Sequence, residues 1–264
     1  MTQALLQLSN VTRRFGGVVA VDGMALRIDT AELVSVIGPN GAGKTTLFNL
    51  ISGLVAPSAG RILFDGHDIT RLPSDRRARL GLARSFQNIR VFGHMTVLEN
   101  ALTGLHPHLS SSLTAIVAGL PRFRREERCA VARASEALDL VGLLGRARER
   151  ATALSYGDQR RLEIARAVAG RPRLLLLDEP AAGMNPAETV ALGALIRVIV
   201  EVGTTVLLVE HNMPFVMNLS DSVTVLNFGQ RIFVGSPEEA RQDGRVIEAY
   251  LGAKVAARLA GARG

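Results

Sequence analysis

The stretch LVSVIGPNGAGKTT, residues 33–46, decides the fold. Its first five residues form a continuous apolar run, which is typical of a strand buried on both faces. Residues 38–45 then fit the pattern G-x-x-x-x-G-K-S/T. A helix should follow, because apolar residues recur there at helical spacing, namely Leu47, Leu50, Ile51 and Leu54. A buried strand, a glycine-rich loop and a helix in this order predict a phosphate-binding loop in an α/β fold.

The residue types in this loop suit a nucleoside triphosphate. Glycines let successive backbone N–H groups turn inward around an anion, and the N-terminus of the helix adds the positive end of its dipole. We expect Lys44 to reach the β- and γ-phosphates and the Thr45 hydroxyl to ligate Mg²⁺. The alternative is a glycine-rich turn that happens to precede a lysine, and the strand–loop–helix context argues against it.

Polar residues also follow two later apolar runs. Asp178 and Glu179 come directly after Leu174–Leu177. We expect Asp178 to hold Mg²⁺, directly or through water, and Glu179 to orient or deprotonate the attacking water. A solvated turn would also explain two adjacent acids. His211 follows the run VLLVE, where it is either a structural histidine or a contact to the γ-phosphate or to Glu179 and its water.

Two other segments are candidate parts of the same site. Gln87 lies in RSFQNIRVF, just before the pattern becomes helical, and is a candidate contact to water or Mg²⁺. LSYGDQRR, residues 154–161, opens a helix, and Ser155 and Asp158 have the spacing of a capping box. The functional alternative uses Ser155, Gly157 and the exposed N–H groups as a second anion site. Such a site would serve the nucleotide of a second subunit.

The alternation of strands and helices is interrupted once. Between about Asn88 and Leu154 no strand leads into a glycine-rich turn. Arg124–Val141 predicts a helix with one apolar stripe, formed by Ala130, Ala134, Ala137, Leu138 and Val141. We expect a helical insertion there, with residues 109–121 as its mobile part. Short β-like runs between Leu5 and Ile28 precede the insertion, and a hairpin over residues 223–234 follows it.

We therefore predict one domain built from three kinds of segment. Residues 1–88 and 160–238 should form a mostly parallel sheet core with an N-terminal antiparallel part. Residues 89–159 should form the helical insertion, and residues 239–264 a helical tail rich in arginine.

Composition bounds the function classes. A hydrophobic content of 47% with 21% charged residues excludes a wholly disordered chain. Cys129 is the only cysteine, so no internal disulfide can form. The net charge is +7, and only Lys44 and Lys254 are lysines, so an arginine-rich genome composition is one explanation. An acidic partner, a lipid surface or nucleic acid are the others, although 4% aromatics without tryptophan argue against base stacking.

No segment is long and apolar enough to span a membrane. The best candidate, residues 192–209, is interrupted by Arg197, Glu201 and Gly203. The N-terminus also lacks the layout of a secretion signal. We therefore expect any membrane role to come through a partner.

Taken together, the segments GPNGAGKT, Gln87, LSYGDQ, LLLLDEP and His211 resemble the ATP-binding subunit of ABC transporters. The resemblance covers essentially the whole chain and implies a P-loop NTPase fold of the ABC ATPase type. It implies a Walker A loop made of Gly38, Pro39, Asn40, Gly41, Ala42, Gly43, Lys44, Thr45 and Thr46. It also implies that Gln87 is the Q-loop glutamine, residues 154–158 the signature, Asp178 and Glu179 the Walker B pair, and His211 the switch histidine.

Phe15 falls where this family places an aromatic side chain against adenine; a half-buried strand aromatic is the alternative. The wording of RSFQNIRVF, LSYGDQRRLEIAR, EPAAGMNP and VIEAYLG is similar to the branched-chain amino acid importer ATPases. Three residues depart from the general ABC pattern: Tyr156 and Asp158 replace glycine and glutamine, and Asn185 stands where most relatives carry aspartate. An acid near a γ-phosphate is unfavourable unless Asp158 turns back into its helix cap.

The resemblance implies a dimer in which two ATP molecules, each with Mg²⁺, lie between two such subunits. The second subunit would be an identical or a related chain, and the pair would bind membrane permease subunits at the cytoplasmic face of the inner membrane. A solute-binding protein would act indirectly, and no nucleic acid would bind.

Three alternatives remain on the sequence alone. The first is an ATPase for another cargo, such as lipid, lipopolysaccharide or a urea or amide compound. The second is a soluble ABC ATPase acting on nucleic acid or ribosomes. The third is a nucleotide-sensing scaffold, which intact Glu179 and His211 disfavour. The sequence does not name the cargo, because the residues that select it would lie in other subunits.

Overall fold

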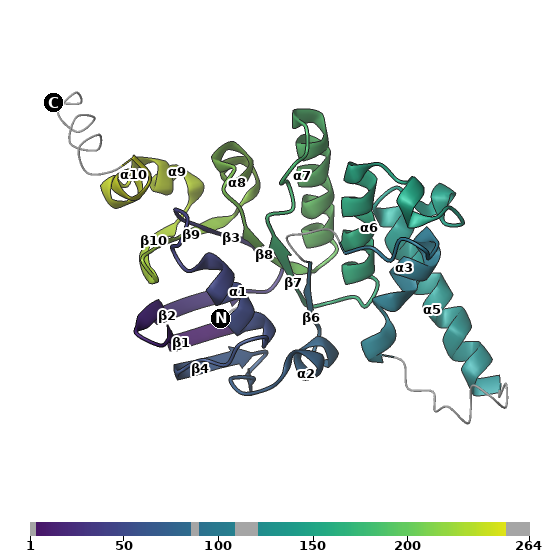
Figure 1. Cartoon of the computed structure of the whole chain (residues 1–264), viewed down its shortest axis with the longest axis horizontal. Coiled ribbons are helices and arrows are strands. Elements are labelled where there is room, and N and C mark those ends of the chain that lie inside the picture. Colours follow the sequence, from purple (N-terminus) through teal and green to yellow (C-terminus); the bar gives the residue numbers. More distant parts are fainter. Residues whose placement is uncertain (1–3, 86–89, 109–120, 252–264) are drawn as a thin grey trace.

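The computed structural model describes residues 4–85, 90–108 and 121–251. Within these ranges the strands form a six-stranded sheet in the order β10-β9-β3-β8-β7-β6 and a four-stranded sheet in the order β2-β1-β4-β5 (Figure 1). The larger sheet consists of β3 (Leu33–Ile37), β6 (Leu82–Arg84), β7 (Leu174–Asp178), β8 (Thr205–Val209), β9 (Ser222–Asn227) and β10 (Gln230–Gly235). The smaller sheet consists of β1 (Ala4–Phe15), β2 (Val18–Asp29), β4 (Ala59–Phe64) and β5 (His67–Asp68).

The larger sheet is parallel except for β10. Strands β9, β3, β8, β7 and β6 pair in parallel, and β10 pairs antiparallel with β9. Every residue of β3, β7 and β8 is buried, as expected for strands covered on both faces. The predicted mostly parallel core is therefore confirmed, and the carboxyl ends of five neighbouring strands meet at one edge of the sheet.

Helix α1 (Lys44–Ser52) lies between the two sheets. Its buried Leu47, Phe48, Leu50 and Ile51 belong to one apolar cluster with side chains from β1, β2, β4, β7 and β8. The smaller sheet is antiparallel, as predicted for the N-terminal part, and its β1 and β2 form a hairpin around residues 16–17. The prediction that Leu54 lies on the apolar face of α1 is wrong, since Leu54 is 55% exposed.

The early end of α1 has two physical causes. Gly53 adopts a left-handed conformation, with φ of 79°, and turns the chain out of the helix. The buried guanidinium of Arg77, in α2 (Ser74–Arg79), then donates to the backbone oxygens of Leu50 and Ile51 at 2.7 and 2.8 Å. A cation at this position satisfies free carbonyl groups at the negative end of the helix dipole.

Helices α3 (Val97–Thr103), α5 (Pro121–Leu140) and α6 (Tyr156–Val168) form a second packed region, the helical part of the molecule. They gather at one end of the molecule (Figure 1). The predicted stripe of α5 and the residue after it are buried there, namely Ala130, Ala134, Ala137, Leu138 and Val141. The same cluster continues to α7 (Pro186–Glu201) and to one face of β7 and β8. Residues 109–120 of the segment predicted to be mobile lie outside the described ranges.

The C-terminal part covers the other end of the larger sheet. α8 (Met213–Leu219) precedes the hairpin β9–β10, whose turn is Phe228–Gly229, and α9 (Pro237–Gln242) and α10 (Gly244–Leu251) follow. The predicted hairpin and the first part of the predicted helical tail are therefore confirmed, and residues 252–264 lie outside the described ranges. None of the described helices is long and apolar enough to cross a membrane.

Candidate functional site

Part of the predicted set, the phosphate loop with Asp178, Glu179 and His211, meets at the carboxyl edge of the larger sheet. The glycine-rich loop follows β3, Asp178 ends β7, and His211 follows β8 by two residues. Because β8 lies between β3 and β7 in the sheet, all three segments are neighbours. Ligands of parallel α/β sheets bind outside the carboxyl ends of the strands. Gln87 lies outside the described residues.

The glycines of the loop are required by its backbone. Gly38 and Gly43 have φ of 152° and 102°, conformations that side chains disfavour. A Cβ atom at Gly38 would overlap the backbone oxygen of Leu226, and one at Gly43 would overlap that of Ala20. Gly43 is the N-cap of α1 without a side-chain hydrogen bond to the cap. The first N–H groups of α1 therefore face the loop, ready to bind an anion.

The loop is braced by both hairpins. The N–H of Gly229, in the β9–β10 turn, donates to the Ala42 oxygen at 3.0 Å, and the N–H of Asp22, in β2, donates to the Gly229 oxygen at 2.9 Å. The loop also closes on itself, since the N–H of Ala42 donates to the Pro39 oxygen at 3.1 Å. These contacts fix the loop before any ligand binds.

Lys44 lies across the loop that precedes it. Its Nζ donates to the backbone oxygens of Gly38 and Pro39 at 2.7 and 3.0 Å. Burial lowers the pKa of Lys44, and the negative charges of Glu179 and Asp178 oppose that shift. The ammonium is thus within electrostatic reach of both acids. Thr45, the next residue of α1, is exposed at the helix N-terminus, and Thr46 is half-buried.

Asp178 is 3% exposed and forms an ion pair with Arg84 of β6. The distance from Arg84 Nη2 to Asp178 Oδ2 is 2.9 Å. Burial raises the pKa of Asp178, and the Arg84 hydrogen bond and charge oppose that shift. Arg84 also donates to Asn49 Oδ1 and Ser52 Oγ of α1 at 2.7 and 2.9 Å. Arg84 therefore joins β6, β7 and α1, a role that the sequence did not indicate.

Glu179 and His211 lie close together, which is one of the arrangements that the sequence left open. His211 Nδ1 is 3.7 Å from Glu179 Oε2. Glu179 has a φ of 47°, which is uncommon for a residue with a side chain, and its N–H donates to the Val209 oxygen at 2.8 Å. The side chain of His211 is 60% exposed and that of Glu179 is 22% exposed. The pair is thus open to a ligand at the edge of the sheet.

Glu210 is a site residue that sequence reasoning missed. Only 1% of it is exposed, and its Oε1 accepts from the N–H of Ala181 at 2.9 Å. Its Oε2 accepts from the N–H groups of His211 and Asn212 at 3.1 and 3.4 Å. The carboxylate therefore joins the turn after Glu179 to the backbone of His211. An acid at the end of the apolar run VLLVE was the available signal, because a buried carboxylate needs donors around it.

The segment of Ser155 and Gly157 lies at the start of α6, beside the start of α7. Ser155 is the N-cap of α6, and its Oγ accepts from the N–H of Asp158 at 3.2 Å. The Tyr156 hydroxyl donates to the Ala182 oxygen at 3.0 Å. A Cβ atom at Gly157 would lie 2.8 Å from Glu188 Oε1. Tyr156 thus contacts the turn after β7, and Gly157 lies beside the start of α7.

Asp158 does not complete the capping box that its spacing allows. Its carboxylate accepts from Arg146 Nη1 at 2.9 Å instead of turning back to its cap. Asn185, the other departure near this segment, is the N-cap of α7, and it forms a full capping box with Glu188.

Phe15 lies at the end of β1, next to the hairpin turn, and is 46% exposed. The guanidinium carbon of Arg13 is 4.4 Å from the centre of its ring, so a cation covers one face of the aromatic side chain. The following strand, β2, reaches the loop through the Ala20 oxygen beside Gly43. Phe15 therefore belongs to the hairpin that flanks the phosphate loop.

The donors at this edge suit Mg²⁺. Magnesium usually binds one or two protein oxygen ligands together with phosphates and water. The Thr45 hydroxyl and the Asp178 carboxylate are oxygen donors of that kind. In the described ranges no three His, Cys, Asp or Glu side chains are grouped so as to hold a metal by themselves.

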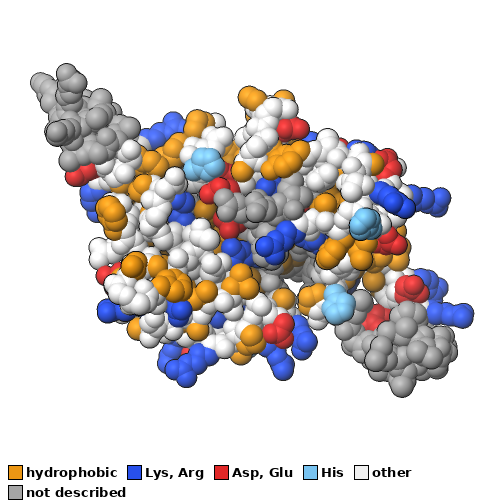
Figure 2. Space-filling view, in the orientation of Figure 1, with side chains coloured by type: hydrophobic (Ala, Val, Ile, Leu, Met, Phe, Trp, Pro, Cys, Tyr) orange, Lys and Arg blue, Asp and Glu red, His pale blue; other side chains and the backbone are white. Residues whose placement is uncertain are grey.

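Charged side chains of both signs and a histidine gather near the middle of the face shown in Figure 2. Elsewhere on this face, lysine and arginine side chains are spread around the edge rather than joined in one patch.

The chain is similar to known proteins over most of its length. The family described as "ABC transporter" matches residues 21–182. The branched-chain amino acid transport ATP-binding protein BraF of Pseudomonas aeruginosa is 48% identical over 253 residues, which are 96% of this chain and 99% of the relative. LivG of Escherichia coli, of the same description, is 46% identical over 96% of this chain and 99% of its own.

Among solved structures, an ATP-binding cassette of an ABC transporter in its ADP conformation is similar with a TM-score of 0.83 and 30% identity. The similarity covers 95% of this chain and 100% of the solved chain. The similarity extends through both sheets and the helical part.

Proposed function

Because the chain belongs to the ATP-binding proteins of the ABC transporter family, we propose that it powers the uptake of branched-chain amino acids by hydrolysing ATP at the carboxyl edge of its larger sheet. One observation supports the catalytic part most directly. Lys44, Asp178, Glu179 and His211 come from three different segments and converge at this edge. A nucleotide held by the loop would place its terminal phosphates among them.

The chain's own residues divide the binding task. The N–H groups of Gly38–Thr46 and the ammonium of Lys44 hold the phosphates, because they surround the N-terminus of α1. Phe15 takes adenine on the ring face that Arg13 leaves open. Thr45, Gln87 and Asp178 would hold Mg²⁺, which neutralises phosphate charge when it is bound.

Two side chains act on the water. The Glu179 carboxylate orients the attacking water and accepts its proton. His211, 3.7 Å from that carboxylate, keeps Glu179 in place and contacts the γ-phosphate. Charge developing on the phosphates is stabilised by Lys44 and by the N–H groups of the loop.

A second chain completes each nucleotide site. The exposed Ser155 and the buried Gly157 lie at the N-terminus of α6, which suits an anion. In the proposed dimer they bind the ATP held by the partner's loop, and the partner is an identical or a related chain. The dimer then opens after hydrolysis.

The helical insertion, residues 89–159, carries this motion to the permease subunits. A groove of about 880 Å³ separates the helical part from the core. Its walls include Leu54 and Phe92, large apolar side chains that are 55% and 50% exposed. A permease helix with an apolar face would bury both. In this arrangement the chain is peripheral at the cytoplasmic face of the membrane, and the solute-binding protein acts from the opposite side.

The cargo is inferred from the relatives. BraF and LivG are named for branched-chain amino acid transport, and each matches the chain over nearly its whole length. Cells in which the chromosomal copy carries Lys44→Ala should lose energy-dependent uptake of radiolabelled leucine. Unchanged leucine uptake, with loss of another transport activity, would assign the ATPase to a different cargo.

The hydrolytic assignment is tested on the purified chain. Glu179→Gln should lower steady-state ATP hydrolysis more than about 100-fold, because the amide cannot accept the proton, while the Kd for ATP stays within about threefold of the parent. Lys44→Ala should instead weaken ATP binding itself by at least about tenfold. Glu201→Gln, an exposed carboxylate at the end of α7, is the matched control and should change neither. Undiminished hydrolysis in Glu179→Gln would refute the assignment.

A further inference from the structure

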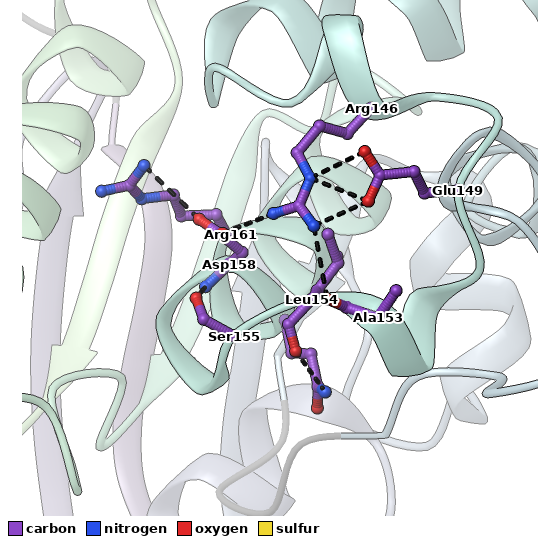
Figure 3. A network of polar contacts seen from close by, with 8 residues as sticks. Arg146, Glu149, Ala153, Leu154, Ser155, Asp158 and Arg161 are labelled. Atoms are coloured by element: carbon purple, nitrogen blue, oxygen red, sulfur yellow. Dashed lines mark hydrogen bonds and ion pairs between the residues drawn. The ribbon is translucent and has the colours of Figure 1, made fainter.

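A network of ion pairs lies beside the start of α6 (Figure 3). Arg146, at the end of the short 3-10 helix Leu144–Arg146, extends its guanidinium between two carboxylates. Its Nη1 donates to Asp158 Oδ2 at 2.9 Å, and its Nη2 donates to Glu149 Oε2 at 2.7 Å. Nη2 also donates to the Ala153 oxygen at 3.3 Å. One arginine thus fixes the turn before α6 and the first turn of α6 itself.

The position of Asp158 gives this network a consequence. Asp158 lies in the first turn of α6, directly after Gly157, and its own N–H donates to Ser155 Oγ. Its carboxylate therefore belongs to the segment proposed to bind the phosphates of the partner's ATP. A negative charge stabilises a helix N-terminus, but it repels a phosphate that approaches the same N-terminus.

The network removes that repulsion. Arg161 lies on the other side of Asp158, with its Nη1 3.7 Å from Asp158 Oδ1 (Figure 3). The two arginines balance the charges of Asp158 and Glu149, so the group as drawn is neutral. Arg146 Nη2 and Nε both donate to Glu149 Oε2, at 2.7 and 3.0 Å. These two bonds fix the orientation of the guanidinium, so that its third nitrogen, Nη1, points to Asp158.

We propose that Arg146 is a positioning residue of the second anion site: it turns the Asp158 carboxylate aside and neutralises it, so that Ser155 and Gly157 can bind the partner's ATP. This inference rests on the proposed function, because it assumes that two chains share each nucleotide. It assigns a purpose to an acid at a position where the family pattern has glutamine. It also predicts that the effect of replacing Arg146 on dimerisation depends on the charge of residue 158.

The test is a double-mutant cycle on ATP-dependent dimerisation. Each variant is made in the Glu179→Gln chain, so that ATP persists, and the dimer Kd is measured by light scattering with ATP and Mg²⁺. Arg146→Gln should weaken the dimer by at least about tenfold, because it releases an uncompensated charge beside the phosphates. Asp158→Asn alone should strengthen the dimer. The double variant should recover the parent affinity or exceed it.

Matched measurements separate charge from folding. Arg148→Gln, an exposed arginine two residues further on, should leave dimerisation unchanged. The loss in Arg146→Gln should shrink as salt is raised, because a charge effect is screened, whereas a packing defect would not respond. Thermal unfolding of each variant excludes a general loss of structure. Arg146→Gln also removes the ion-pair partner of Glu149. If dimer affinity recovers in the double variant, the loss in Arg146→Gln is due to the charge of Asp158 and not to that of Glu149.

The outcomes distinguish this inference from the function on which it rests. Failure of Asp158→Asn to restore Arg146→Gln, in a parent that dimerises, would overturn the inference alone. A parent that stays monomeric with ATP would contradict a dimer of identical chains. The same four variants, without Glu179→Gln, are then compared by the ATPase rate of the transporter purified from membranes through a tag on this chain. The same order of variants is expected there, and equal rates would overturn the inference.

Discussion

The phosphate loop and the start of α6 are both helix N-termini that suit an anion, but they are built differently. The loop, Gly38–Gly43, is shaped by backbone conformation, by carbonyl oxygens packed against two glycines and by hydrogen bonds from neighbouring hairpins. The start of α6 is shaped by side chains, namely the Ser155 cap, the Tyr156 hydroxyl and the Arg146 ion pairs. The loop is therefore held by backbone packing and backbone hydrogen bonds, whereas the start of α6 is held by side-chain hydrogen bonds and charges.

This difference teaches where each region is vulnerable. Added volume should damage the phosphate loop, because backbone atoms cannot move aside. Changes of charge should damage the start of α6, because its polar groups are held by partners that single substitutions remove. The following predictions test that contrast, beginning with the largest expected effect.

Gly43→Ala should abolish ATP binding and destabilise the fold. The new Cβ atom would overlap the Ala20 oxygen at a φ of 102°, so we expect a loss of more than about 2 kcal/mol in the free energy of unfolding. Gly41→Ala is the matched control: its φ is 80°, but no atom lies within 4 Å of the built Cβ. It should cost about 1 kcal/mol of strain and retain measurable binding. Urea unfolding and ATP titration measure both, and equal losses in the two variants would contradict the steric account.

Glu210→Gln should lower kcat about tenfold while the KM for ATP changes less than twofold. The amide nitrogen cannot accept from the N–H groups that the carboxylate binds, and losing a buried acceptor costs about 1–3 kcal/mol. The affected groups are the backbones of Ala181 and His211, near the Glu179 carboxylate that is proposed to act on the water, while the phosphate loop and Lys44 keep their own contacts. Steady-state kinetics well below the melting temperature provide the measurement, with Glu201→Gln as the control. A rise in KM without a change in kcat would place Glu210 in nucleotide binding instead.

Asn185→Ala should destabilise the chain by about 1 kcal/mol, because it removes the side chain that caps α7. Asn185→Asp should restore the stability, since aspartate caps a helix as well as asparagine does. Urea unfolding of the three proteins checks this. If the alanine variant is as stable as the parent, the cap in the structure contributes nothing measurable.

The smallest effect concerns the titration of Glu149. Hydrogen bonds from Arg146 lower the pKa of Glu149 below its ordinary value. The ion pair of Arg146 and Glu149 therefore stabilises the folded state at pH values above the ordinary pKa of glutamate. This stabilisation is lost as the pH falls through the lowered pKa of Glu149. NMR titration of the Glu149 carboxyl should show the lowered pKa in the parent and an ordinary one in Arg146→Gln. An unchanged titration in that variant would show that the ion pair is not formed in solution.

The elements that could be predicted are those in which the apolar pattern of the segment itself matches the strand or helix that forms. The buried runs at β3, β7 and β8 and the stripe of α5 follow directly from apolar periodicity. The closeness of Glu179 and His211 followed from strand ends that meet at one edge. Periodicity failed at Leu54, because a left-handed glycine and a distant arginine end α1 earlier than the apolar pattern does.

The partners of charged side chains could not be read from the sequence. Arg84 and Asp178 are far apart in the chain, and their pairing depends on β6 lying beside β7. Asp158 has the spacing of a capping box, yet it pairs with an arginine from the preceding turn. In both cases several partners satisfy the same local rules, and only tertiary packing selects one of them.

The brace between Gly229 and Ala42 also bears on how the protein is made. The nucleotide loop is synthesised well before one of its supports, the β9–β10 hairpin. At roughly 5–20 residues per second, the ribosome needs on the order of ten seconds or more to go from the loop to that hairpin. A nascent chain therefore exposes an unbraced loop until the hairpin has been made. Competence to bind ATP should arrive late and abruptly, when residues 222–235 leave the exit tunnel.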